Sequence, residues 1–508
     1  MKKLYTIVSL MLSSLSIMAT DFKDCSMAIK SNISTNIEKS NTTVSINGRT
    51  FSINGVKYDN TDLGNVELTN LQIIDGYSDG TMVYATSEPQ YITIGGEKVA
   101  ANFRGEVRNS KFRGILNLTI NGSNYIAMIG DKADELGQLP NAGFEEFHTA
   151  TVTIKDLLAP SGTFKSDEPN SWHSFQSATG SKKKYVGSSI DTYKEDNDKR
   201  TGSTDKRCVK IQSSIVKVVG IEKPANGTMT TGRLYAGSTS AIDPANNSTM
   251  DFADKDKDGN GDPFYPIFTT KPDAMTVWVK FKGNVKDHPN ATVKAILAND
   301  RVQDPEKDDY KKNVIARAAN KQIESKNFAW QELNIPFKYE NKNTPKGMLV
   351  TISTNAEAGK ASSDKNNLDV IYVDDIAMIY NSGLKSAQYK NTNLSFANNK
   401  TAIEIEGKAN EADFSIASDG EGAYISKVLK TNESETGKST LYITITSNDL
   451  QKSNCFEVAI TDKTATGIFN IKNDSNATSS TLYNLAGQQV SNSYKGIIIK
   501  NGKKYINK

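Results

Sequence analysis

Residue types that build disulfide frameworks and many reaction centres are scarce in this 508-residue chain. Cysteine, histidine and tryptophan each occur three times, and hydrophobic residues make up only 37% of the sequence. Cys25, Cys208 and Cys455 are widely separated and uneven in number, which excludes a disulfide framework and a cysteine-based metal site. The histidines also lack the spacing of metal ligands, so histidine catalysis is poorly supported. The low hydrophobic content favours several thin domains over one large core.

Long hydrophobic runs are absent except at the amino terminus. Two lysines precede an apolar run from Leu4 to Met18, and Ala19 follows it. This is the pattern of a secretory signal peptide over residues 1–19. No other stretch is apolar enough to cross a bilayer, so we expect a protein that is not membrane-spanning and is secreted or held at the cell surface.

Signals for nucleotide or nucleic-acid chemistry are also missing. The net charge is +3, and the lysine run 182–184 has no interleaved aromatic residues, so we expect no nucleic-acid partner. Residues 76–80 match the Gly-x-Ser-x-Gly pattern of a hydrolase nucleophile. A strand follows them where a helix would be needed, so we interpret them as a turn.

Short alternating segments between turn signals predict an all-β, multi-domain fold. In residues 20–136, two-residue turn signals separate strands with one apolar face, which predicts an up-and-down meander. These signals are Asn47-Gly48, Asn54-Gly55, Gly95-Gly96 and Asn121-Gly122. The one helix expected is at 308–326, and the polar segment 181–206 is expected to form a mobile loop.

The stretch from Leu368 to Tyr380 is β-branched and apolar at both parities, which predicts a strand buried on both faces at the centre of a large β domain. Asp374 and Asp375 interrupt it. Because a buried carboxylate must be paired or must bind a metal, we expect a cation or a polar network at this point.

Six motifs follow one another in residues 137–382: Asn141 to Glu145, Trp172 to Phe175, Ala225 to Gly232, Pro263-Phe264 with Lys271-Pro272, Trp330 to Phe337, and Tyr372 to Ile376. Their order resembles the putative carbohydrate-metabolism domain of Bacteroidales secreted proteins. The resemblance implies a jelly-roll β-sandwich like that of carbohydrate-binding modules, and points to a glycan as partner.

The remaining segments suggest three smaller units. Residues 20–136 resemble a calycin-like domain through 64–71 and 103–120, and 383–463 have the size and alternation of an Ig-like sandwich. Residues 464–508 resemble the sorting domain of the type IX secretion system, through Leu482 to Val490 and Lys495 to Ile499. That resemblance implies type IX secretion machinery as a partner and the outer-membrane surface of a Gram-negative bacterium, or release from it, as the location. An ordinary β cap is the alternative.

Residues 254–262 match the first nine positions of a calcium loop, because acidic residues alternate before glycine. The expected calcium ligands are Asp254, Asp256, Asp258, Asn260 and Asp262. Tyr265 stands where the closing glutamate would be. The alternative is a solvated acidic loop.

A second candidate calcium site combines Glu145, and its neighbour Glu146, with Asp374 and Asp375. The first and last strands of a jelly roll can be neighbours, so these acids could share one structural calcium. A hydrogen-bonded carboxylate network is the alternative. A glycosidase pair is less favoured, because adjacent acids on one strand are expected to point to opposite faces.

The tryptophans are the candidate carbohydrate-binding residues, because exposed aromatic rings can stack on sugars. Val277, Val279 and Phe281 share one parity, which places Trp278 on the opposite, wet face. The alternative is that a neighbouring domain or loop covers Trp278. Trp330 has a similar position, whereas Trp172 is more typical of a core anchor.

The sequence thus favours a glycan-binding protein with structural calcium that breaks no bond. One alternative is a glycoside hydrolase or other glycan-processing enzyme that uses jelly-roll carboxylates. The other is an adhesin or scaffold that binds protein.

Overall fold

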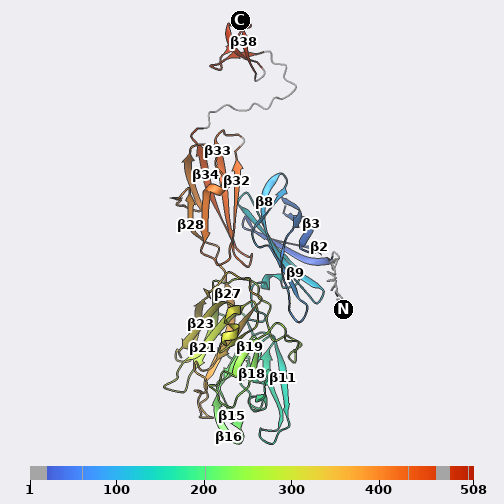
Figure 1. Cartoon of the computed structure of the whole chain (residues 1–508), viewed down its shortest axis with the longest axis vertical. Helices are drawn as coiled ribbons and strands as arrows, with labels where there is room; N and C mark the ends of the chain where they lie inside the picture. The colour runs from blue at the N-terminus through green and yellow to red at the C-terminus, as the bar shows by residue number, and fades with distance from the viewer. Residues whose placement is uncertain are drawn as a thin grey trace, which may run out of the picture.

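The computed structural model describes residues 20–464, apart from 60, 201 and 433, and residues 481–507, apart from 501 and 502 (Figure 1). Strands dominate the described residues, which confirms the predicted all-β, multi-domain fold. The helical segments are short: α1 (Lys183–Val186), η1 (Ala133–Glu135), η2 (Phe175–Ser177), η3 (Asp308–Asn313) and η4 (Glu411–Asp413). Among them, none has the length and apolarity that a bilayer crossing requires. The expected signal peptide lies outside the described residues.

The amino-terminal unit is one antiparallel meander in the strand order β4-β3-β2-β1-β10-β9-β8-β6-β5, with β7 also paired to β8. Its core includes Phe51, Phe103 and Leu116. The strands are β1 (Thr20–Ser31), β2 (Ser34–Asn47), β3 (Thr50–Tyr58), β4 (Thr61–Leu68), β5 (Gln72–Ile74), β6 (Met82–Ala85), β7 (Gln90–Ile94), β8 (Glu97–Arg108), β9 (Lys111–Ile120) and β10 (Ser123–Ile129).

The turn signals of this meander are mostly confirmed. Gly95-Gly96 and Asn121-Gly122 connect paired strands, and all four residues have positive φ, as the tight hairpin turns require. The turn expected at Asn54-Gly55 is wrong. β3 continues through it with a register shift between Ile53 and Val56, so Gly55 takes up a β-bulge instead.

The second unit is a sandwich of two five-stranded sheets. Sheet one has the order β13-β14-β27-β20-β24, and sheet two has the order β17-β26-β21-β23-β25. Their facing residues form one buried core that includes Val277, Phe281, Val350 and Val373. The strands are β13 (Thr192–Glu195), β14 (Cys208–Gln212), β17 (Thr228–Thr230), β20 (Ala274–Lys282), β21 (Ala291–Ala298), β23 (Val314–Ile323), β24 (Trp330–Pro336), β25 (Lys338–Tyr339), β26 (Gly347–Ser353) and β27 (Val370–Ile379).

Three small sheets decorate this sandwich: β11-β12, β15-β16 and β18-β19-β22. Their strands are β11 (Phe147–Ile154), β12 (Gly162–Pro169), β15 (Ser214–Val218), β16 (Ile221–Ala225), β18 (Arg233–Ala236), β19 (Asn246–Met250) and β22 (Val302–Asp304).

Two expectations for this unit have clear outcomes. β27 is the middle strand of sheet one, as its apolar pattern predicted. The helix expected at 308–326 is wrong, because η3 is followed by strand β23, which pairs with β21 and β25. Val314, Ile315 and Ala316 are buried there, so sheet packing overrides the helix propensity of the alanine-rich segment.

The third unit has two facing sheets, β29-β28-β31 and β30-β34-β33-β32, around a core that includes Leu441, Ile443 and Val458. The carboxy-terminal sheet has the order β36-β35-β37-β38. Their strands are β28 (Leu384–Tyr389), β29 (Thr392–Asn393), β30 (Lys400–Ile405), β31 (Phe414–Ser418), β32 (Tyr424–Thr431), β33 (Lys438–Thr446), β34 (Ser453–Asp462), β35 (Leu482–Asn484), β36 (Gln489–Val490), β37 (Gly496–Lys500) and β38 (Lys503–Asn507).

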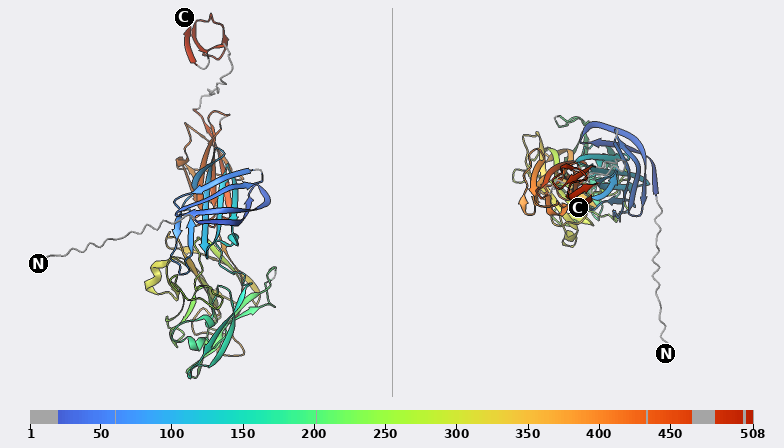
Figure 2. Two further views of the ribbon diagram at one scale, coloured as in Figure 1. Left: turned by 90° about the vertical axis from the view of Figure 1, so that its right-hand side faces the viewer. Right: turned by 90° about the horizontal axis from the view of Figure 1, so that it is seen from above.

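The meander lies against both sandwiches, as Figure 2 shows from two further directions. Ile74 and Tyr77 of the meander share a buried cluster with Phe252 and Leu349 of the second unit. A second cluster joins the meander to the third unit and contains Ile115, Ile126, Leu136, Tyr424 and Leu450. These shared apolar clusters fix the relative positions of the three units, because separating them would expose buried side chains.

We expect Trp172→Ala to destabilise the second unit by about 3–5 kcal/mol, the usual cost of truncating a buried tryptophan. Trp172 is fully buried, and its Nε1–H donates to the Pro140 carbonyl at 3.1 Å. Urea unfolding followed by tryptophan fluorescence reports on this unit, because Trp278 and Trp330 also lie in it. The fully exposed Leu157 gives the control, Leu157→Ala. Equal midpoints for the two variants would contradict this placement of Trp172.

Candidate functional site

A β-bulge in β27 lies at the two neighbouring aspartates. Thr276 of β20 pairs with Ala377, but Trp278 pairs with Asp374, so β27 contains one extra residue here. Asp375 has a φ of 45°, which is uncommon for a residue other than glycine and concentrates at functional sites. The expectation that adjacent acids must point to opposite faces is therefore wrong, because the bulge interrupts the alternation.

The bulge brings both aspartates together with Asp205, which sequence reasoning missed. One oxygen from each of the three carboxylates lies within 4.8 Å of the other two. Asp374 is completely buried. Its Oδ1 accepts the Asp375 N–H at 3.0 Å, whereas its Oδ2 has no hydrogen-bond partner. Arg200 Nε donates to Asp375 from the loop 196–207.

Burial and mutual repulsion disfavour three charged carboxylates here. Burial raises the pKa of Asp374 to about 7, and the charge of Asp375 adds to the effect. Burial, then the hydrogen bond with Asp375 and its charge, raise the pKa of Asp205 to about 6, and Arg200 opposes this. Without a cation, two members of the acid triad (Asp205, Asp374 and Asp375), namely Asp374 and Asp205, therefore keep their protons to a higher pH than ordinary carboxyl groups do.

Glu145 borders the acid triad, and Glu146 does not. Glu145 Oε1 accepts the backbone N–H groups of Lys206 at 2.8 Å and Arg207 at 3.1 Å, which holds the loop carrying Asp205. The Glu146 carboxylate is exposed and lies 4.0 Å from Lys132. Of the acids expected to share a calcium, Asp374 and Asp375 thus meet directly, and Glu145 supports their third partner.

The acids of residues 254–262 point to three groups of partners, and Asp254 and Asp256 share Arg233. Asp256 pairs with Arg233 at 2.6 Å, and Asp262 accepts the Ser171 N–H at 2.9 Å. Asp258 points to histidines on the other side of the loop. Tyr265, at the closing position, contacts Ser78 of the meander. This geometry does not support the expected calcium loop, since its carboxylates diverge and the bidentate ligand is missing.

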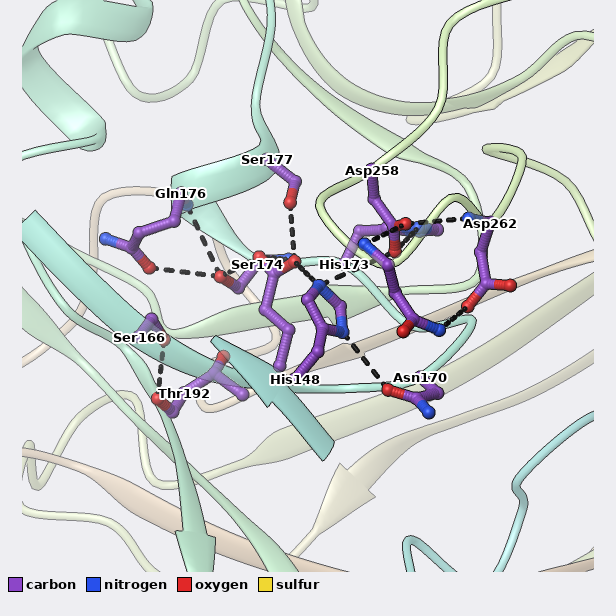
Figure 3. A network of polar contacts seen from close by, with 12 residues as sticks. His148, Ser166, Asn170, His173, Ser174, Gln176, Ser177, Thr192, Asp258 and Asp262 are labelled. Atoms are coloured by element: carbon purple, nitrogen blue, oxygen red, sulfur yellow. Dashed lines mark hydrogen bonds and ion pairs between the residues drawn. The ribbon is translucent and has the colours of Figure 1, made fainter. Parts of the chain in front are cut away.

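A buried histidine–carboxylate network instead uses Asp258 (Figure 3). Asp258 Oδ2 lies 3.3 Å from His173 Nε2 and 3.6 Å from His148 Nε2. Burial alone would raise the pKa of Asp258, but contact with His173 and the charges of both histidines lower it overall. Through His148, the network ties the loop 254–262 to β11. Because His173 is fully buried, the network is closed to a substrate.

Glu168 of β12 extends this network. Its Oε2 lies 3.7 Å from His148 Nε2, and its Oε1 accepts the Ser174 N–H at 2.8 Å. Sequence reasoning missed the network because its residues are far apart in the chain and meet only through tertiary packing.

The three tryptophans do not form an open sugar platform. Trp172 is buried in the core, so the core-anchor interpretation fits it and the stacking role does not. Trp278 lies on the outer face of sheet one, as its parity predicted, but the Arg200 guanidinium covers its ring at 5.0 Å. Trp330 Nε1–H donates to Asp198 at 3.3 Å. The segment 181–206, expected to be mobile, thus packs on this face through Asp198 and Arg200.

The outer face of sheet two carries an open groove of about 500 Å³, within the range usual for small-ligand sites. Thr351 and Ser353 of β26 and Thr292 of β21 form its floor, opposite to the core-facing side chains. Val216 and Leu234 supply apolar wall, and Tyr235 is exposed at the edge. Lys294 and Asp304, joined at 2.7 Å, are its central charged pair.

Several polar atoms in the groove have no hydrogen-bond partner. They are Thr292 Oγ1, Thr351 Oγ1 and Asn226 Oδ1. These oxygens have almost no solvent-accessible surface, and unpaired buried polar groups are costly. A ligand or water that reached them would satisfy them. Hydroxyl and aliphatic residues alternate over 350–353, and this alternation is the sequence signal that could have indicated a polar outer face.

A second cavity of about 1310 Å³ lies between the meander and the second unit. Charged side chains line it from both, including Glu106 and Arg108 of the meander and Glu145 and Asp205 of the second unit. The acid triad thus borders this cleft through Asp205.

No protein-family model, curated protein or solved structure matches this chain. Function is therefore inferred from the acid triad and from the groove of sheet two.

We expect Asp374→Asn to flatten the pH dependence of stability in metal-free buffer. The folded-state pKa of Asp374, about 7, exceeds the unfolded value of about 3.9. Its stabilising contribution is thus complete below about pH 4 and is lost as the pH rises through 7. Between pH 4 and pH 8, wild type should lose on the order of 4 kcal/mol more than the variant.

Urea unfolding at several pH values in EDTA, followed by tryptophan fluorescence, measures this difference. Asp256→Asn is the control, because Asp256 is exposed, and it should retain the wild-type slope. Parallel plots of unfolding free energy against pH for wild type and Asp374→Asn would refute the raised pKa of Asp374.

Proposed function

We propose that this protein binds an oligosaccharide in the groove of sheet two, without breaking a bond, and that a calcium ion at the acid triad stabilises the sandwich. The groove carries the proposal. Its floor combines hydroxyl and amide groups with apolar wall, and sugars present the matching combination of hydroxyl groups and C–H faces.

Three unpaired polar atoms in the groove support a hydroxyl-rich ligand. Thr292 Oγ1 and Thr351 Oγ1 can each donate or accept a hydrogen bond, and Asn226 Oδ1 can accept one. Lys294 and Asp304 are already paired, so together they offer hydrogen bonds without a net charge. Tyr235 supplies an aromatic face at the edge.

The carboxylate positions favour binding over hydrolysis. A glycosidase needs two carboxyl groups about 5–9.5 Å apart across the scissile bond. Among the described residues that line the groove, Asp304 is the one carboxylate, and Lys294 holds it. The acid triad has carboxylates, but its oxygens lie within 4.8 Å of one another, which is closer than a sugar between them would allow.

The acid triad fits a calcium ion in charge and spacing. Calcium takes oxygen ligands at about 2.3–2.6 Å, so two of its ligands can lie up to about 5 Å apart. Three carboxylates and Arg200 leave a net charge of about −2 when ionised. The unpaired Asp374 Oδ2 is buried, and it would be a direct ligand. The ion would supply the positive charge that burial otherwise forces protons to provide.

We expect Tyr235→Ala to weaken oligosaccharide binding about tenfold, since an aromatic contact is worth about 1–1.5 kcal/mol. A glycan array first identifies a binding oligosaccharide, and isothermal titration calorimetry then measures its affinity. Tyr483→Ala is the matched control, because Tyr483 is similarly exposed at 41%, against 42% for Tyr235, on the carboxy-terminal sheet. Absence of any bound glycan, or an equal loss in both variants, would overturn the groove assignment.

We expect calcium to raise the unfolding free energy by about 3 kcal/mol at one hundred times its dissociation constant. Asp374→Asn should abolish this gain, because it removes a buried ligand. Asp256→Asn should keep the gain, because it leaves the acid triad unchanged. If Asp256→Asn abolished the gain and Asp374→Asn kept it, the calcium site would be the loop 254–262. Equal stability of wild type in calcium and in EDTA would exclude structural calcium.

A further inference from the structure

Five exposed aliphatic residues lie at loop tips of the second unit and have no role in the core or the groove. Leu157 and Leu158 are at the tip of the β11–β12 hairpin, and Val219 and Ile221 are at the tip of β15–β16. Ile242 lies in the loop 238–245. Their side chains are 53–103% exposed. Single exposed aliphatic residues are ordinary, but such a group at hairpin tips is typical of an interaction surface.

These loops are neighbours at one end of the molecule. Lys184 of α1 pairs with Asp156 at the β11–β12 tip at 2.7 Å, and Ser189 Oγ donates to the Ile215 carbonyl of β15 at 3.4 Å. Lys223 of β16 reaches the Thr239 carbonyl at 3.4 Å. Figure 1 places β15 and β16 at the end of the second unit that is remote from β33 and β34.

The same loops carry an excess of positive charge. In the segments 155–158, 181–187, 214–225 and 238–245, six lysines stand against three carboxylates. Two of those carboxylates are engaged, since Asp156 pairs with Lys184 and Glu222 pairs with Lys365. Among the described residues, five of the lysines form no ion pair: Lys155, Lys182, Lys183, Lys217 and Lys223.

We propose that this end of the second unit docks on a lipid surface that carries anionic phosphate headgroups. Leu157, Leu158, Val219 and Ile221 enter the boundary between headgroups and acyl chains, while the unpaired lysines face the phosphates. Apolar insertion and lysine–phosphate attraction together give stable but reversible attachment, which neither would give alone.

The chemistry of the loop tips favours lipid over protein as the partner. Protein interfaces concentrate tyrosine, tryptophan and arginine around a packed centre. The tips here offer separate aliphatic side chains that project from hairpins, with lysines behind them. Lys182 and Lys223 also line the groove, so the docked protein would hold the groove close to the headgroups. The lipid proposal does not depend on which ligand the groove takes.

Co-flotation of the protein with vesicles tests the proposal. Wild type should bind vesicles of phosphatidylcholine and phosphatidylglycerol, and should bind pure phosphatidylcholine at least about tenfold less. Raising the salt concentration should weaken binding, because lysine–phosphate attraction is screened. Failure to bind anionic vesicles, or equal binding to both, would overturn the proposal.

Two sets of variants separate the contributions. Leu157→Asp combined with Val219→Asp and Ile221→Asp should reduce binding at least about tenfold. Lys155→Ala combined with Lys183→Ala and Lys217→Ala, none of which lines the groove, should reduce the salt dependence of binding. Ile33→Asp with Ile37→Asp is the matched control, because both residues are similarly exposed on the meander. Loop variants that bind like wild type, or a control that loses binding equally, would contradict the proposed face.

Each variant is checked by urea unfolding and by binding of the soluble oligosaccharide. A variant that keeps wild-type stability and oligosaccharide binding but loses vesicle binding supports the docking surface independently of the groove. Leu157→Gln gives a second, milder test, since this fully exposed side chain can change without affecting the core, and wild-type vesicle binding by Leu157→Gln would count against insertion of that tip.

Discussion

Burial of Asp374 in the middle strand of sheet one is the constraint on which the second unit depends. A carboxylate in this position must be protonated or neutralised. The bulge in β27 turns Asp375 toward it, Glu145 holds the loop that supplies Asp205, and Arg200 donates to Asp375. The loop 196–207 therefore folds over sheet one as a consequence of the local charge.

The outer faces of the two sheets differ as a result. Sheet one has its outer face occupied by Asp198 and Arg200, which cover the polar and aromatic side chains there. Sheet two keeps its outer face open as the groove, with polar atoms that lack partners. The proposed ion site and the proposed recognition groove thus lie on opposite sides of one core, so ion binding at the acid triad would alter stability without rearranging the groove directly.

Sequence reasoning reached the architecture but only part of the candidate site. Period-two alternation and glycine-rich turns were sufficient for the all-β fold, and the apolar pattern of 368–380 placed β27 at the centre of its sheet. Asn54-Gly55 and the segment 308–326 were misassigned, because a bulge and a strand pairing depend on partners distant in sequence. Asp205 was missed for the same reason. Trp172 and Trp278 drew attention to sheet one because aromatic content is visible in a sequence, whereas a groove floored by Thr292, Thr351 and Ser353 depends on packing.

The meander lies beside the two sandwiches and is held to them by two separate apolar clusters, one at Tyr77 and Phe252 and one at Tyr424 and Leu450. Rotation of either sandwich about its connecting segment would have to break one of these clusters. The three units should therefore tumble as a single elongated particle. A ligand or surface that captured one end would consequently fix the orientation of the other end.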